Sequence, residues 1–176
     1  MMKISTRHIV TAVAVVALFF TSQSFAQSSE DSKATRFGIG VNVGVSTDDP
    51  YGLVLGGDLR LQQDFSSNVS GILSAGYTNF SVKNAFDGLG IDSYDVIPVK
   101  AGIKVFPVER FYISGEIGAG FGVDNGSRTA FIYAPGIGIG TNSGLDLGLR
   151  YEGIARSGSS LGQVALRIAY GFKLTK

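Results

Sequence analysis

Apolar and polar residues alternate along the chain in eight successive segments that begin at Arg36. A period of two is typical of β-strands, and the Gly, Asn, Asp, Ser and Pro residues between the segments are turn formers. We expect strands near residues 36–46, 51–63, 69–82, 94–106, 111–123, 129–140, 145–155 and 161–173. Because no helical spacing competes after residue 35, the pattern predicts an all-β fold.

Each predicted strand sorts its side chains onto two different faces. One face is apolar in every strand, and its bulky members include Leu59, Val99, Ile103, Ile117, Leu147 and Leu166. The other face holds many Gly, Ala and Ser residues together with nine charged ones: Asp58, Arg60, Lys100, Lys104, Glu116, Asp146, Arg150, Glu152 and Arg167. The predicted sheet therefore has one apolar and one polar surface.

Side-chain volume decides which face points inward. An eight-stranded barrel has room inside for side chains or one small ligand, and the bulky apolar face would overfill it. The Gly-rich face suits a narrow lumen, and the apolar face suits lipid. Unpaired backbone groups are costly in hydrocarbon, so the sheet must close. We predict an eight-stranded antiparallel up-and-down transmembrane β-barrel with a polar, Gly-rich lumen and an apolar exterior.

Aromatic residues gather toward both ends of the predicted strands, as in the two interfacial belts of membrane barrels. We assume that the N-terminus starts at the periplasmic rim. The periplasmic belt then contains Phe37, Phe111, Tyr170 and Phe172. The outer belt contains Tyr51, Tyr77, Phe121, Phe131 and Tyr151, and Phe80 and Tyr94 also fall toward the outer rim.

The first 26 residues follow another pattern. Lys3 and Arg7 precede an apolar run at 9–20, and Ser24 and Ala26 supply a small-x-small end. This order is typical of a secretory signal peptide cleaved after Ala26, because twelve apolar residues are too few for a membrane-spanning helix. We expect residues 27–35 to form a short periplasmic tail and residues 36–176 to form the barrel.

Composition narrows the possible chemistry. The chain has no cysteine, and its one histidine, His8, lies in the predicted signal peptide. Residues 27–176 therefore lack the side chains that most often act as general base, thiol nucleophile or transition-metal ligand. The formal net charge of +1 gives no basic field for nucleic acid. We expect no catalytic residue, no metal, no cofactor and no nucleic-acid partner.

The nine inward charges allow two interpretations. If Val105 faces Phe111 across the turn between them, Lys100 lies opposite Glu116, and Asp146 comes within a diagonal of Arg167. Such pairing makes buried charge tolerable and favours a lumen plugged by ion pairs. The alternative is a very narrow or gated ion path with Lys100 and Glu116 at its constriction.

Glycine and proline add two expectations for the wall. Gly118, Gly120 and Gly122 are expected beside Gly136, Gly138 and Gly140, where they would leave space for long side chains; no helix follows that could form a nucleotide-binding loop. Pro98 and Pro135 lie inside predicted strands, where proline removes a ladder hydrogen bond. We expect a bulge or local distortion near each proline.

The outer connections are short. They carry the acids Asp48, Asp49, Asp87, Asp92, Asp95 and Asp124, whose spacing matches no calcium loop, so we interpret them as solvated loop charge. The longest connection, residues 83–93, is the best candidate for contact with another surface.

Taken together, these residues resemble the small outer-membrane β-barrels of Gram-negative bacteria, the OmpX-like and OmpA-transmembrane-domain-like proteins. The resemblance covers the predicted mature chain and includes the phrases IPVKAGIKVF at 97–106, FYISGEIGAGFGV at 111–123 and LRIAYGF at 166–172. It implies recognition of a terminal aromatic by the barrel assembly machinery. Here residues Lys173–Lys176 follow Phe172, so either that signal tolerates a tail or assembly is less efficient.

The resemblance implies a multi-pass protein of the outer membrane that contacts lipid and lipopolysaccharide. We expect a monomer without catalytic activity that contributes to envelope integrity or to surface interaction through its short loops. A small ion or solute channel is the alternative, and a soluble periplasmic lipid-binding barrel is a further one. Some outer-membrane barrels are enzymes, but no carboxylate dyad or Ser–Lys cluster is evident in the loops.

Overall fold

The computed structural model describes residues 34–86, 90, 92–123, 129–156 and 158–174. The predicted signal peptide and residues 27–33 of the predicted tail lie outside the described residues. The strands are β1 (Thr35–Ser46), β2 (Tyr51–Asp64), β3 (Val69–Val82), β4 (Tyr94–Val105), β5 (Phe111–Gly122), β6 (Ala130–Gly140), β7 (Leu145–Arg156) and β8 (Ser159–Lys173). One 3-10 turn, η2 (Asn84–Phe86), follows β3. No helix in the described part of the chain is long and apolar enough to cross a membrane.

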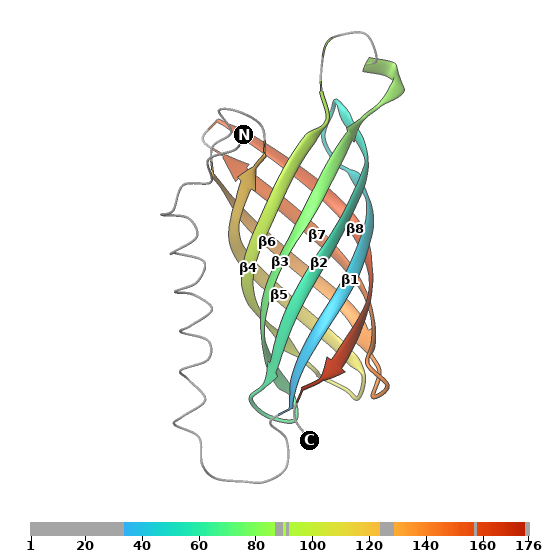
Figure 1. The fold of residues 1–176 in the computed structure, drawn as a ribbon, viewed down its shortest axis with the longest axis vertical. Helices are drawn as coiled ribbons and strands as arrows, with labels where there is room; N and C mark the ends of the chain where they lie inside the picture. Colours follow the sequence, from blue (N-terminus) through green and yellow to red (C-terminus); the bar gives the residue numbers. More distant parts are fainter. Residues whose placement is uncertain (1–33, 87–89, 91, 124–128, 157, 175–176) are drawn as a thin grey trace. The chain divides into compact units, whose positions relative to one another are not determined.

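The eight strands form a closed barrel in which each strand pairs with its neighbours in the sequence (Figure 1). Every pair is antiparallel, and β1 closes on β8 from Arg36↔Lys173 to Ser46↔Gln163. Closure leaves no strand edge unpaired, as hydrocarbon requires. The predicted fold class is confirmed.

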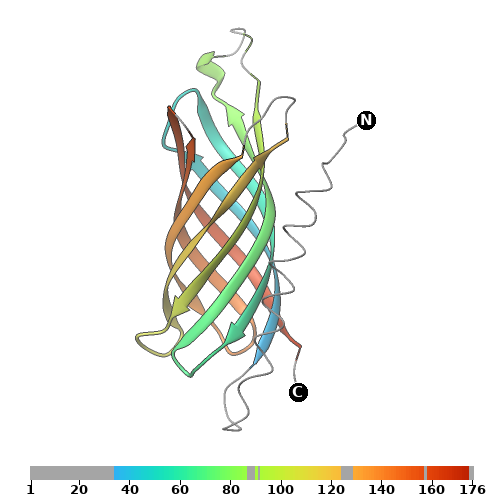
Figure 2. The same ribbon diagram turned by 90° about the vertical axis from the view of Figure 1, so that its left-hand side faces the viewer.

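The barrel has two different ends, best seen in the turned view of Figure 2. We call the end where β1 begins and β8 finishes the terminal rim; it also carries the turns 65–68, 106–110 and 141–144. The opposite end, the loop rim, carries the connections 47–50, 83–93, 123–129 and 157–158. An even number of strands places the first and last residues of the sheet at the same rim.

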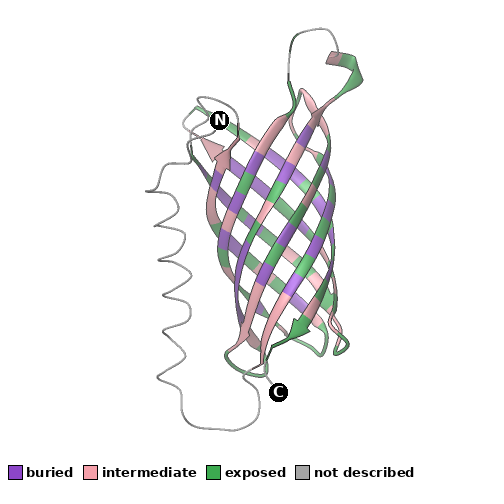
Figure 3. Ribbon diagram, in the orientation of Figure 1, coloured by how far each residue is buried: buried purple, intermediate pink, exposed green. Residues whose placement is uncertain are grey.

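Burial alternates along the strands, which gives the banded colouring of Figure 3. Five of the six residues predicted to face lipid are exposed, between 45% for Leu147 and 61% for Ile117 and Leu166, and Val99 is half-buried. The alternate residues of the same strands are buried although many are polar or charged. The alternation is that of an inside-out barrel with its bulky apolar side chains on the outer surface.

Register differs from expectation between β4 and β5. Val105 pairs with Ile113, not with Phe111, so the strands are displaced by two residues. The turn holds Phe106, whose N–H bonds to the Asn68 carbonyl, and Arg110, which has a φ of 73°. The displacement moves Lys100 opposite Gly118 and leaves Glu116 opposite Gly102. The predicted Lys100–Glu116 pairing is therefore wrong.

The two prolines interrupt the ladder without shifting it. Pairing passes from Ala75↔Val99 to Thr78↔Val96 around Pro98, and from Tyr133↔Gly153 to Gly136↔Arg150 around Pro135, in constant register. The expected disturbance is thus a local loss of pairs on one side of each proline, and no bulge forms there. The irregularity in register lies instead in β2, between Tyr51 and Val54.

Candidate functional site

The lumen collects the charged residues that the sequence placed on the polar face. Eight of the nine are at most 9% exposed, and the side chain of the ninth, Asp146, is 16% exposed. They come from β2, β4, β5, β7 and β8, so their contacts cross the interior of the barrel. Charges this deeply buried require partners, and the structure supplies them in two groups.

The first group centres on the carboxylates of Glu116 and Glu152. Arg60 Nη2 lies 2.7 Å from Glu116 Oε1, and the Ser74 hydroxyl donates to Glu116 Oε2 at 2.7 Å. Glu152, on β7, accepts hydrogen bonds from the Lys100 ammonium and, at 2.9 Å, from the Gln163 amide. Arg150 is a more distant neighbour, with Nη2 3.7 Å from Glu152 Oε2.

The second group centres on Arg167 of β8. Its Nε and Nη2 donate to the Asp58 carboxylate at 3.0 and 2.7 Å, and the Asn42 amide donates to Asp58 at 2.8 Å. Its Nη1 lies 3.2 Å from Asp146 Oδ1, so these two residues do lie side by side. Lys104 also pairs with Asp146. Two carboxylates thus hold Arg167 and Lys104 inside the barrel.

An aromatic residue completes the second group. The Tyr112 hydroxyl donates to Asp146 at 2.8 Å, and the Lys104 ammonium lies 4.0 Å from the centre of the Tyr112 ring. The side chain needs the space left by two glycines, because a Cβ on Gly138 would lie 2.4 Å from Tyr112 Cζ and one on Gly148 would lie 2.8 Å from the Tyr112 hydroxyl oxygen. Gly40 serves Arg167 likewise, since a Cβ there would lie 2.8 Å from Nη2.

The glycines do not form the continuous stripe that we expected. Gly136 pairs with Ser114 and Gly138 with Tyr112, whereas Gly118 and Gly120 pair with Ile132 and Ala130. Register between β5 and β6 therefore sets the two glycine runs at different heights. Inward glycines nevertheless leave room for long side chains, as the surroundings of Gly40 and Gly138 demonstrate.

The lumen near the loop rim is apolar, which the sequence analysis missed. Val54, Phe80, Val96, Ala130, Ile132 and Ile154 form a cluster in which each residue is at most 4% exposed. We call these six residues the apolar plug. The alternation in the sequence already indicated that these side chains point inward. All six occupy even-numbered positions, which share a face with the predicted lumen charges of β2, β4 and β7 or pair with that face.

Aromatic residues at the loop rim divide between the two surfaces. Tyr51, expected in the outer belt, packs with Tyr94 against the plug, and both rings lie about 6 Å from that of Phe80. The irregularity after Tyr51 explains its position, because it displaces that residue from the alternation of β2. The exposed aromatics at this end include Tyr77, Phe131 and Tyr151, while Phe121 is half-buried.

At the terminal rim, the exposed aromatics include Phe65, Tyr170 and Phe172, and the ring centres of the last two are 4.9 Å apart. Phe37 and Phe111 are half-buried at the same rim. These positions agree with the aromatic girdles of membrane barrels.

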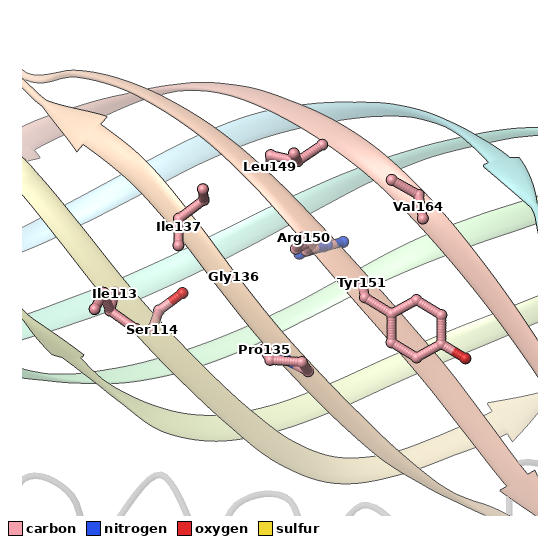
Figure 4. A pocket seen from close by; sticks show the side chains of 9 residues that line it. All are labelled: Ile113, Ser114, Pro135, Gly136, Ile137, Leu149, Arg150, Tyr151 and Val164. Carbon is pink, nitrogen blue, oxygen red and sulfur yellow. The ribbon is translucent and has the colours of Figure 1, made fainter.

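A hollow of about 360 Å³ opens on the wall around Pro135 (Figure 4). It is lined by Ile113, Ser114, Pro135, Gly136, Ile137, Leu149, Arg150, Tyr151 and Val164. The hollow lies where β6–β7 pairs are missing at Pro135. Because the exterior side chains at its edge are apolar, the hollow suits an acyl chain better than a polar solute.

The loop rim carries more acids than bases among its described residues. The acids are Asp48, Asp49, Asp92 and Asp95, and the bases are Lys83 and Arg156. Lys83 pairs with Asp49 at 2.7 Å. Asp95 accepts a hydrogen bond from Asn79 at 2.7 Å. Asp87 and Asp124 lie outside the described residues. No group of three or more acids or histidines able to hold a metal occurs in the described part of the chain.

The comparison with family models identifies one family. The profile of the family described as "Outer membrane protein beta-barrel domain" matches residues 12–172. No curated protein sequence is significantly similar to the chain.

Solved structures share the fold at low sequence identity. Ail, the attachment invasion locus protein of Yersinia pestis, superposes with a TM-score of 0.59 at 22% identity, covering 80% of this chain and 99% of that one. The N-terminal β-barrel domain of Pseudomonas aeruginosa OprF gives 0.58 at 9% identity, covering 80% and 99%. The outer membrane enzyme PagL gives 0.56 at 16% identity, covering 76% and 98%.

Proposed function

Because the chain belongs to the outer membrane protein beta-barrel domain family, we propose that it is a non-catalytic barrel that contributes to envelope integrity or to surface interaction through its short loops. Its place is the outer membrane. We further propose that residues 1–26 are removed during export and that the terminal rim faces the periplasm. The partners would be membrane lipid, lipopolysaccharide and, during biogenesis, the barrel assembly machinery. We propose a monomer.

The packed lumen carries the proposal. Lys100, Glu116 and Glu152 lie at mid-lumen and are at most 3% exposed, so a molecule as small as water does not reach most of their surface. An open channel would leave the charged residues of its wall hydrated. Buried, paired charge instead supports a solid barrel whose interior holds the strands in place.

Two observations support a role without catalysis. Residues 27–176 contain neither histidine nor cysteine. The buried carboxylates of the lumen are each paired with at least one cation, which favours a structural role over general acid or base catalysis. PagL is an enzyme with a similar barrel, but at 16% identity the similarity concerns the fold alone.

The charge of the loop rim indicates what charge a surface partner would carry. One solved structure contains Ail with the heparin analogue sucrose octasulfate, a polyanion. In this chain the described loop-rim residues carry more acids than bases, so we propose that a similar polyanion binds poorly. A surface partner would present cationic or neutral groups toward Asp48, Asp49 and Asp92.

Planar-bilayer recording of the refolded protein tests the closed barrel. We expect membranes that stay silent under applied voltage once heat-modifiable migration on a gel has verified folding. Steady conductance steps in the wild type would contradict the proposal and favour the channel. A barrel from a known porin serves as the positive control for insertion.

A strain that lacks the protein tests the role in the envelope. We expect increased uptake of an apolar dye, restored by the wild type. A variant in which a short Gly-containing turn replaces residues 84–92 separates the two roles. It should restore the dye barrier if the barrel itself supports the envelope, and it should lose any binding to host or bacterial surfaces. No change in either assay on deletion would contradict the proposal.

A further inference from the structure

The lumen changes in character along its length. Near the terminal rim its contents are polar: Arg36 pairs with Asp64 at 2.7 Å, and Gln62 and Ser70 donate hydrogen bonds to the same carboxylate. The ion pairs extend from this rim, where Lys104 lies opposite Ser70, to mid-lumen, where Lys100 pairs with Glu152. Near the loop rim the six residues of the apolar plug replace them. A small ion that crossed the barrel would therefore have to pass three different zones.

Seven of the eight strands contribute to the apolar plug or border it. Its residues come from β2, β3, β4, β6 and β7. Beside Gly120 of β5, side chains of the neighbouring strands fill the lumen. A Cβ on Gly120 would lie 2.8 Å from Ile132 Cδ1 and 2.9 Å from Val96 Cγ2. From β8, Leu161 packs against the plug, and Tyr51 and Tyr94 pack against it as well.

Burial is least complete at the opposite end. The side chains of Arg36 and Asp64 are 32% and 13% exposed, and that of Asp146 is 16% exposed. The side chain of Glu152, the carboxylate closest along β7 to the plug residue Ile154, is not exposed at all. Water thus reaches the polar network only at the terminal rim, since Lys104, Glu116 and Glu152 are at most 3% exposed.

These zones resist ions in different ways. Charged and polar side chains can give up their present partners and bind an entering ion or water instead. In doing so they replace part of the hydration shell of the ion. An apolar constriction offers no such replacement and closes a pore by excluding water. We propose that the apolar plug is the seal of this barrel, a hydrophobic gate, and that the ion pairs beneath it stabilise the wall without being the barrier to ions. This inference rests on the proposed closed barrel.

Paired variants separate the plug from the ion pairs. Phe80→Ala combined with Ile132→Ala removes the largest plug side chain and one of its two isoleucines, and Glu116→Gln breaks the Arg60 pair at mid-lumen. Leu59→Ala combined with Ile117→Ala removes comparable apolar volume from the exterior and is the control. In planar bilayers we expect conductance from the plug variant and none from Glu116→Gln or the exterior control. Because the plug variant loses core packing, Val54→Thr, which adds a hydroxyl at nearly constant volume, is recorded as well.

Thiol labelling locates the seal without electrical recording. The chain has no cysteine, so Thr78→Cys introduces a single thiol on the lumen side, two residues from Phe80 and itself 3% exposed. A membrane-impermeant thiol reagent is added to whole cells. We expect no labelling in the otherwise wild-type or Glu116→Gln background, and complete labelling in the plug variant. Asp49→Cys, whose parent side chain is 67% exposed at the loop rim, is the positive control.

The outcomes are distinct. Conductance or labelling in the Glu116→Gln background overturns the inference, because the ion pairs would then form the barrier. Silence and absent labelling in both the plug variant and Val54→Thr, each verified as folded by heat-modifiable migration, also overturn it. Conductance of the wild type would contradict the proposed function itself, and the other two results leave that function intact.

Discussion

Arg150 is the lumen cation with the weakest partner. The nine lumen charges comprise five cations and four carboxylates, and Arg150 must share Glu152 with Lys100. Its Nε finds no hydrogen-bond partner among the described residues. Arg150→Met should therefore leave the free energy of unfolding unchanged or raise it, whereas Lys100→Met should lower it by about 3–5 kcal/mol because Glu152 loses its close cation. Guanidinium unfolding in detergent micelles compares the two variants, and equal losses would show that Arg150 is needed as a partner.

Leu59 and Leu53 test how deep the exterior wall lies in the bilayer. Both face outward from β2 and are about equally exposed, at 50% and 49%, but Leu59 lies near the middle of the strand and Leu53 near the loop rim. Leu59→Arg should lower the free energy of unfolding by about 2–4 kcal/mol, and Leu53→Arg by about 0–1 kcal/mol, because the cost falls toward the interface. Unfolding from lipid vesicles measures both. A similar cost at the two positions would contradict the membrane placement of β2.

Between the first and last strands, Asp48 forms a clasp at the loop rim. Its Oδ2 accepts the Gly162 N–H at 2.7 Å and the Thr47 hydroxyl at 2.9 Å, and the Thr47 N–H donates to the Gly162 carbonyl at 2.9 Å. Asp48→Ala should cost roughly 1.5–3 kcal/mol, the range for hydrogen bonds to a charged group. Asp49→Ala breaks only an exposed pair with Lys83 and should cost less than about 1 kcal/mol.

Hydrogen exchange measured by mass spectrometry provides a second measurement of the clasp. In Asp48→Ala we expect faster exchange in the loop-rim ends of β1 and β8, with no change in β4 or β5. Uniformly faster exchange would show that Asp48 acts on global stability and not on the β1–β8 seam.

At the scale of strands, alternation predicted where each element lies but not how neighbours align. A shift of two residues in register keeps every side chain on its face, so the alternation cannot reveal such a shift. That is why the expected Val105–Phe111 alignment could be displaced to Val105–Ile113 while Lys100 and Glu116 both stayed inside. Which cation meets which carboxylate depends further on distances across the lumen, as in the contact of Arg60 on β2 with Glu116 on β5.

The whole molecule was more predictable than its interior contacts, because one physical requirement governs it. Hydrocarbon forces closure and an apolar exterior, and both can be counted from side-chain alternation. The apolar plug shows the limit of that count. Phe80 and Ile132 lie on the same face as the charged residues. When a whole face is classified as polar, its few apolar residues are overlooked. Only the packing of several strand ends together reveals them as a separate zone.

Closure, and not the order of strands along the chain, should therefore decide whether the barrel forms. β1 and β8 are joined by a continuous ladder, and Arg36 lies opposite Lys173 at the terminal rim. A circular permutant that links these ends by a short Gly/Ser segment, with new termini between Ser66 and Ser67 in an exposed turn, should refold and keep heat-modifiable migration on a gel. A chain shortened before Ser159 lacks β8, leaves two unpaired edges in hydrocarbon, and should not fold. A folded short chain, or a permutant that fails to fold with several linker lengths, would show that closure alone does not determine the structure.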